Sequence, residues 1–72
     1  MFSDNSIKKI LKKAGALRIS GSAVKKLKTI IEDYSLKLAR KAVKNAEYSG
    51  RKSVKSEDIE EAIRNEELDL VE

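Results

Sequence analysis

The segment Gly50–Ile59, which reads GRKSVKSEDI, is the most informative part of this sequence. It opens with a glycine that can end a helix, and it contains Ser56, which can cap the next one. The segment Ala14–Ser20, AGALRIS, has the same order of glycine, basic residue and serine. Between the two segments runs one uninterrupted helical pattern of roughly eight turns. Two basic loops flanking one long helix predict a protein that grips a polyanion at two spaced points, and duplex DNA is the obvious polyanion.

Length and composition predict a single domain over residues 1–72. A chain of 72 residues buries a small fraction of its surface, so a partner is expected to stabilise it. Cysteine and histidine are absent, which excludes disulfides and the common zinc sites, and no cofactor is expected. There is neither an apolar stretch long enough to span a membrane nor the apolar core of a signal peptide. We therefore expect a cytoplasmic, nucleoid-associated protein with no membrane or small-molecule partner.

The net charge of +4 conceals a sharp asymmetry along the chain. Residues 1–55 contain 15 Lys or Arg and 4 Asp or Glu, a balance of +11. Residues 56–72 contain one Arg and 8 acidic residues, a balance of −7. A basic body predicts phosphate binding, whereas the acidic end is expected to avoid nucleic acid or to meet a basic neighbour. A chain that merely solvates itself with Lys and Glu is the alternative interpretation.

The apolar and capping pattern predicts an all-α chain of three helices. The first carries its apolar stripe over residues 7–14, at the i, i+3, i+4, i+7 spacing, and Gly15 ends it. The second is expected from about Gly21 to Ser49, after a cap at Ser20 or Ser22.

The third helix is expected to follow a cap at Ser56, with Glu57 and Asp58 in its first turn, where the helix dipole favours acidic residues. Residues 17–19 and 53–55 are short, β-compatible pieces before the second and third helices. The acidic tail at residues 65–72 has three open interpretations: it extends the third helix, packs on a dimer or frays.

The second helix has an apolar face too broad for its two short flanking helices to cover. At about 40 Å it is also longer than a domain of this size is wide. An intertwined homodimer, in which two long helices cross, is the expected solution. The apolar seam consists of Val24, Leu27, Ile31, Tyr34 and Leu38, whereas the solvent side is expected to hold Lys37, Arg40, Lys41 and Lys44, with Glu47 as an ion-pair partner.

A short helix, a loop with an embedded arginine, a long helix, a basic loop and a short helix follow one another in the order of the histone fold. Over about residues 7–64 the chain resembles the archaeal histones. Gly50–Ile59 is close to the family's Gly-Arg-Lys-Thr-Ile/Val-Lys-x-Glu-Asp-Ile, and Ala14–Ala16 followed by Arg18–Ser20 is the second match. The resemblance implies a handshake homodimer, in which the first loop of one protomer lies beside the second loop of its partner and pairs with it through short strands.

The resemblance also implies which residues contact DNA. Arg18 would point into the minor groove, and Lys52, Ser53 and Lys55 would meet phosphates. Arg51 and Asp58 match a structural ion pair that joins the second loop to the third helix. The full set of expected DNA-binding residues is Lys9, Lys12, Lys13, Arg18, Lys25, Lys52, Ser53 and Lys55.

The chain departs from the family where archaeal histone dimers join end to end. The matching residues are Asn45, Tyr48, Asp58 and Glu61, where the family often has Leu, His, Asp and Leu. Each missing leucine removes roughly 1.5 to 3 kcal/mol of burial. We therefore expect a firm dimer whose tetramer or filament contact is weak, altered or dependent on DNA, although Tyr48 offers a hydrogen bond across such a contact.

The leading prediction is an archaeal-type histone that binds, bends and compacts duplex DNA without sequence preference. The alternative is a histone-fold subunit of a regulatory or other heteromeric complex. A helix-turn-helix regulator would need a short recognition helix rather than one of about eight turns. An enzyme is not expected, because the chain has no His, Cys, glycine-rich phosphate loop or separated acid and base pair.

Overall fold

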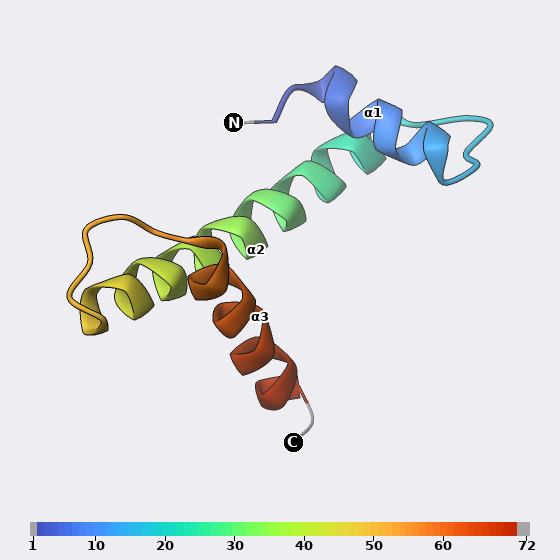
Figure 1. The fold of residues 1–72 in the computed structure, drawn as a ribbon. Coiled ribbons are helices and arrows are strands. Elements are labelled where there is room, and N and C mark those ends of the chain that lie inside the picture. The colour runs from blue at the N-terminus through green and yellow to red at the C-terminus, as the bar shows by residue number, and fades with distance from the viewer. Residues whose placement is uncertain (1, 71–72) are drawn as a thin grey trace. The chain divides into compact units, whose positions relative to one another are not determined.

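The structure is a computed structural model that describes residues 2–70, with side chains described up to Glu66. It contains α1 (Asp4–Lys13), α2 (Gly21–Tyr48) and α3 (Ser56–Leu70) (Figure 1). The 28 residues of α2 give this helix a length of about 42 Å. No strand occurs within residues 2–70, so the predicted all-α class is confirmed.

Two compact units make up the chain, and the division falls within α2, between Tyr34 and Ser35. The first unit combines α1 with the N-terminal half of α2. The second unit combines the C-terminal half of α2 with α3. The single domain over residues 1–72 stays a prediction.

The first unit is built around one large aliphatic side chain. Ile7 of α1 is fully buried, and Val24 of α2 is 2% exposed. The hydroxyl of Ser3 caps α1 by accepting a backbone N–H of the first turn at 3.1 Å. Lys28 Nζ lies 3.3 Å from Asp4 Oδ1 and links α2 to the start of α1.

Both helices that precede a loop end in the same way, at a glycine with positive φ. Gly15 has φ of 105° and Gly50 has φ of 72°. Each glycine N–H donates to the carbonyl three residues earlier, and the following N–H donates to the carbonyl five residues before it. These distances are 3.0 and 3.1 Å after α1 and 2.9 Å for both bonds after α2. This Schellman arrangement satisfies the last carbonyl groups of each helix and confirms both predicted stops.

The two helix starts that follow the loops differ. Of the two predicted caps, Ser20 rather than Ser22 caps α2, because its hydroxyl accepts the Ala23 N–H at 3.1 Å. The predicted cap at Ser56 is wrong: Ser56 is the first residue inside α3, and Lys55 takes the cap position. The Asp58 carboxylate accepts the Lys55 N–H at 2.8 Å, and the Lys55 carbonyl accepts the Asp58 N–H at 3.0 Å. This bond satisfies the Lys55 N–H as one half of a capping box does, with the acidic side chain three positions further along the chain.

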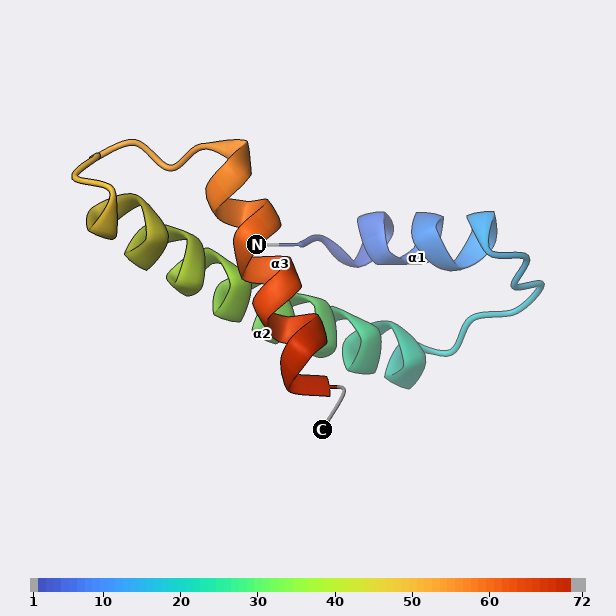
Figure 2. The same cartoon turned by 60° about the horizontal axis from the view of Figure 1, so that its bottom comes forward.

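Small side chains form the core of the second unit. Ala42 and Ala46 of α2 and Ala62 of α3 are each at most 2% exposed. Alanine at a helix contact lets two helix axes approach closely. Figures 1 and 2 show α3 crossing the C-terminal half of α2. Two acidic residues of α3, Asp58 at 2% and Glu66 at 5% exposure, are buried in the same unit.

The helix α3 continues as far as Leu70. Of the three interpretations of residues 65–72, extension of the third helix is therefore correct for residues 65–70. Residues 71 and 72 lie outside the described part of the chain.

Large apolar side chains remain exposed in both units. In the first, Ile30 is 53% and Tyr34 is 48% exposed, and in the second, Val43 is 46% and Ile59 is 44% exposed. Neither 17–19 nor 53–55 forms a strand within the described chain, so strand pairing between protomers stays a prediction.

Candidate nucleic-acid interface

A bidentate ion pair closes the loop between α2 and α3, here called the second loop (residues 49–55). Arg51 Nη2 donates to Asp58 Oδ1 at 2.8 Å, and Arg51 Nη1 donates to Asp58 Oδ2 at 2.9 Å. Arg51 Nη1 also donates to the carbonyl oxygen of Ser53 at 3.0 Å. Together with the bond from the Lys55 N–H to Asp58, these contacts fix the loop backbone at residues 53 and 55.

The ion pair is strongly ionised at neutral pH. Hydrogen bonds from the Arg51 side chain and from the Lys55 N–H lower the pKa of Asp58 from 3.8 to about 2. The same hydrogen bond to Asp58 raises the pKa of Arg51. Glu57 Oε1 lies 3.8 Å from Arg51 Nη2 as an exposed outer partner. The Asp58 carboxylate therefore stays ionised, and able to pair with Arg51, throughout the physiological pH range.

The other polar residues of the second loop face solvent. Lys52, Ser53 and Lys55 are all exposed. Within the described residues, neither the Lys52 nor the Lys55 ammonium forms an ion pair. The clamp between Arg51 and Asp58 thus leaves two cations and a hydroxyl available on a fixed backbone.

The first loop (residues 14–20) is held only by its ends, the Schellman turn at Gly15 and the cap at Ser20. Arg18 is exposed and, among the described side chains, pairs with no carboxylate. Leu17, beside it, is 100% exposed. This loop presents one cation and one apolar side chain.

The helix α1 gathers three predicted cations, Lys9, Lys12 and Lys13, around the half-exposed Ile10 and a shallow hollow. Lys12 and Lys13 lie in the last turn, where the helix dipole favours cations. Lys25 is exposed near the start of α2. These residues and Arg18 belong to the first unit, whereas the predicted contacts of the second loop belong to the second.

The four candidates for a contact between dimers fall into two classes. Asn45 and Asp58 are already engaged within the chain: Asn45 Nδ2 donates to the Asp58 carbonyl oxygen at 3.0 Å, and the Asp58 carboxylate is held by Arg51. Tyr48, 87% exposed, and Glu61 are open to solvent. The bond from Asn45 ties the end of α2 to the first turn of α3.

The sequence prediction missed the buried carboxylate of Glu66. Lys37 Nζ lies 3.1 Å from Glu66 Oε2, and Lys41 pairs with the other carboxylate oxygen. Hydrogen bonds from Lys41 and then Lys37 lower the pKa of Glu66. The sequence prediction assigned Glu47 as the ion-pair partner on this side of α2, and Glu66 takes that place for both lysines. Glu66 lies 25 and 29 positions from these lysines in the sequence, and the crossing of α3 over α2 brings them together.

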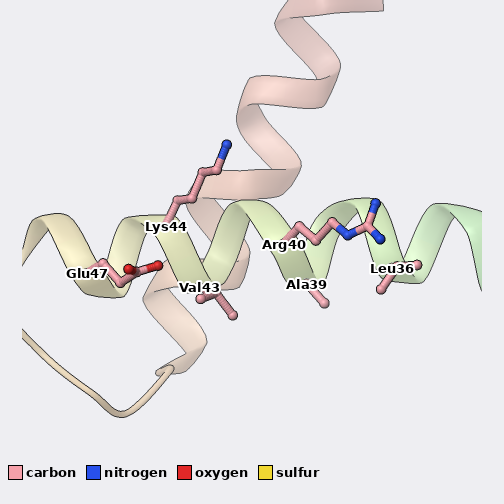
Figure 3. Close-up of a pocket in the computed structure, with 6 residues that line it drawn as sticks. All are labelled: Leu36, Ala39, Arg40, Val43, Lys44 and Glu47. Atoms are coloured by element: carbon pink, nitrogen blue, oxygen red, sulfur yellow. The ribbon is translucent and has the colours of Figure 1, made fainter.

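A hollow with an apolar floor lies along the outer side of α2 in the second unit. Leu36, Ala39 and Val43 form the floor, and their side chains point to the same side of the helix (Figure 3). Arg40, Lys44 and Glu47 border the hollow. The three floor residues follow a spacing of three and four, which is the pattern that a second helix packs against.

The described residues offer neither a metal site nor a membrane span. No group of three acidic side chains that would suit a metal ion occurs among them. None of their helices is long and apolar enough to cross a membrane.

Comparison with known proteins places these features in a family. Residues 2–63 match the family described as histone-like transcription factor (CBF/NF-Y) and archaeal histone. The chain is 40% identical over 58 residues to one of the subunits of archaeal histone HAN1 from Thermococcus zilligii, covering 81% of this chain and 87% of that protein. It is 46% identical over 56 residues to probable archaeal histone 3 of Methanocaldococcus jannaschii, covering 78% and 84% respectively.

Proposed function

Because the chain belongs to the family of archaeal histones and histone-like transcription factors, we propose that it binds duplex DNA without sequence preference and bends, wraps and compacts the chromosome. Proteins of this histone family are structural DNA-binding proteins that associate with the chromosome. Family membership thus confirms the prediction that the chain is not an enzyme.

One observation carries the proposal: the predicted cations are exposed on backbone that is already fixed. In the second loop, Lys52 and Lys55 are presented by a segment that Arg51 and Asp58 hold in shape. In the first loop, Arg18 lies between the Schellman turn at Gly15 and the helix cap at Ser20. A preorganised loop loses little conformational entropy when it meets phosphates.

Each cationic group has a role in this proposal. Arg18 enters the minor groove, where the negative potential attracts an arginine. The second loop binds phosphates through Lys52, Ser53 and Lys55. The first unit adds phosphate contacts from Lys9, Lys12, Lys13 and Lys25, and such contacts position the protein without reading sequence.

A second copy of the chain completes the proposed binding unit. The exposed floor at Leu36, Ala39 and Val43 in the second unit and the exposed Ile30 and Tyr34 in the first supply apolar surface for it. Burial of this surface at about 25 cal/mol per Å² favours association. Each dimer would then carry both loops twice.

The contact between dimers is proposed to be weak. The side chains of Asn45 and Asp58 already form hydrogen bonds within the chain. Glu61 places a charge where an apolar contact would be needed. Light scattering in the absence of DNA is expected to give the mass of a dimer at micromolar concentration. A tight tetramer under these conditions would contradict this part of the proposal.

Salt titration of binding tests the proposed DNA contacts. Two duplexes of about 60 base pairs that are unrelated in sequence but equal in the number of TA steps are expected to bind with similar affinity. This affinity falls steeply with salt because phosphate contacts release counterions. Arg18→Ala and Lys52→Ala are each expected to weaken binding and to reduce the log–log salt slope by about 0.9 for each phosphate that is no longer neutralised. Arg64→Ala removes one exposed charge from α3, outside the proposed surface, and serves as the matched control.

A heteromeric subunit is the second candidate, because the family description includes transcription factors and one relative is named as a subunit. Such a protein would pair with a different chain. Absent DNA binding at low salt, or a large preference for one duplex, would favour this candidate over the homodimeric packaging protein.

A further inference from the structure

The first loop carries a feature that phosphate binding leaves unexplained, the fully exposed side chain of Leu17. It is the only large apolar residue with 100% exposure within the described part of the chain. Apart from Tyr48, which is 87% exposed, the other exposed large apolar residues, such as Ile30 and Val43, keep roughly half or more of their surface covered. A leucine without any contact in its own chain contributes nothing to the stability of that chain.

Hydrogen bonds fix the two ends of the first loop, on either side of Leu17. Two hydrogen bonds of 3.0 and 3.1 Å close the turn at Gly15, two residues before it. Three residues after it, the Ser20 side chain caps α2 at 3.1 Å, and the Ser20 carbonyl accepts the first bond of the helix at 3.2 Å. The apolar side chain of Leu17 therefore lies within three residues of both fixed ends of the first loop, the turn at Gly15 and the cap at Ser20.

The positive charge of the residues around Leu17 indicates an acidic binding partner. Residues 5–31 contain eight Lys or Arg and no Asp or Glu, and Arg18 directly follows Leu17. The second loop, the segment that resemblance would place beside it in a dimer, is also basic, with Arg51, Lys52 and Lys55. An acidic partner is needed to neutralise this field, and duplex DNA is the acidic partner of the proposed function.

An arginine beside an exposed leucine fits one recurrent mode of DNA recognition. Proteins that bend DNA from the minor groove combine cations in the groove with an apolar side chain that wedges between base steps and partly unstacks them. Pyrimidine–purine steps such as TA open at the lowest energy. We propose, resting on the proposed DNA binding, that Leu17 is such a wedge, that it bends the duplex beside Arg18, and that it favours flexible TA steps.

The wedge is tested with the full chain on two duplexes of about 60 base pairs, one with TA steps in helical phase and one built from stiff A-tracts. We expect Leu17→Ala to reduce end-to-end energy transfer, a measure of bending, on the TA duplex and to weaken its binding roughly threefold to tenfold, with little change on the A-tracts. Wild-type protein is also expected to brighten 2-aminopurine placed at the TA steps, because unstacking relieves quenching. The variant should lose this increase.

Leu17→Met is the matched control, because it keeps an apolar side chain of similar size and should retain bending and the fluorescence increase. Unchanged bending in Leu17→Ala would overturn the wedge. So would a lower melting temperature of the DNA-free Leu17→Ala protein that depends on protein concentration, since Leu17 would then be covered by a second copy. If wild-type protein fails to bind either duplex, the proposed function fails. If it binds and Leu17→Ala matches it, only the wedge fails.

Discussion

The two units of the chain are stabilised by different physical means. The first unit buries Ile7 against α2 and links its helices by one exposed ion pair, between Asp4 and Lys28. The second unit has a core of alanines and adds two buried carboxylates. Asp58 pairs with Arg51, and Glu66 pairs with Lys37 and Lys41. An apolar core is insensitive to pH, whereas a carboxylate core depends on ionisation. The stability of the second unit, which contains the second loop, is therefore expected to depend on pH. The stability of the first unit is expected to depend on pH much less.

The largest expected effect comes from the apolar unit. Ile7→Ala leaves a cavity where the side chain is fully buried and is expected to cost about 2–5 kcal/mol of unfolding free energy. Urea unfolding at fixed protein concentration measures this loss. Ile10→Ala, at a half-exposed position of the same helix, should cost clearly less. Equal losses in the two variants would contradict the placement of the core at Ile7.

Removal of the clamp should affect the second unit next most strongly. Arg51→Ala leaves the nearly buried Asp58 carboxylate without its bidentate partner and frees the loop backbone at residue 53. Both the melting temperature and the affinity for DNA are expected to fall. Calorimetry and a binding titration measure the two effects. An unchanged melting temperature would show that Arg51 has no structural role.

The pH dependence follows from the lowered pKa of Asp58. Because the folded chain holds this pKa at about 2 rather than 3.8, its stabilisation is complete above the ordinary value and is lost as the pH falls toward 2. Melting temperatures of the wild type are therefore expected to drop over this range. Asp58→Asn should start lower and show a flatter profile. Parallel profiles for the two proteins would argue against the clamp.

The smallest expected loss of stability concerns the glycines at the two helix ends. It should be similar in both units, because both loops begin with the same turn. Gly15→Ala and Gly50→Ala each force a side chain into positive φ and are expected to cost about 1–2 kcal/mol. No neighbouring atom lies within 4 Å of the added Cβ at either position, so backbone conformation alone accounts for the loss. Gly21→Ala, at a helical position with equally open space, is the control and should not destabilise the protein.

The order of the helices, and where most of them begin and end, could be predicted from local signals in the sequence. The glycine stops at residues 15 and 50, and the serine cap expected at residue 20 or 22 and found at residue 20, act through hydrogen bonds that span at most five residues. Such local signals are complete in the sequence. The basic character of both loops was also evident from the sequence, since it needs only the identity of the residues.

In contrast, only the packing of α3 on α2 shows which polar side chains form ion pairs and hydrogen bonds within the chain. The pairing of Glu66 with Lys37 and Lys41, and the bond from Asn45 to the Asp58 carbonyl, join residues 13 to 29 positions apart across two helices. No spacing rule predicts them, because they depend on where α3 crosses α2 and on the alanines that set the closeness of that crossing. The start of α3 belongs with the local signals instead, because the Asp58 carboxylate that accepts the Lys55 N–H lies three residues away and its partner Arg51 seven.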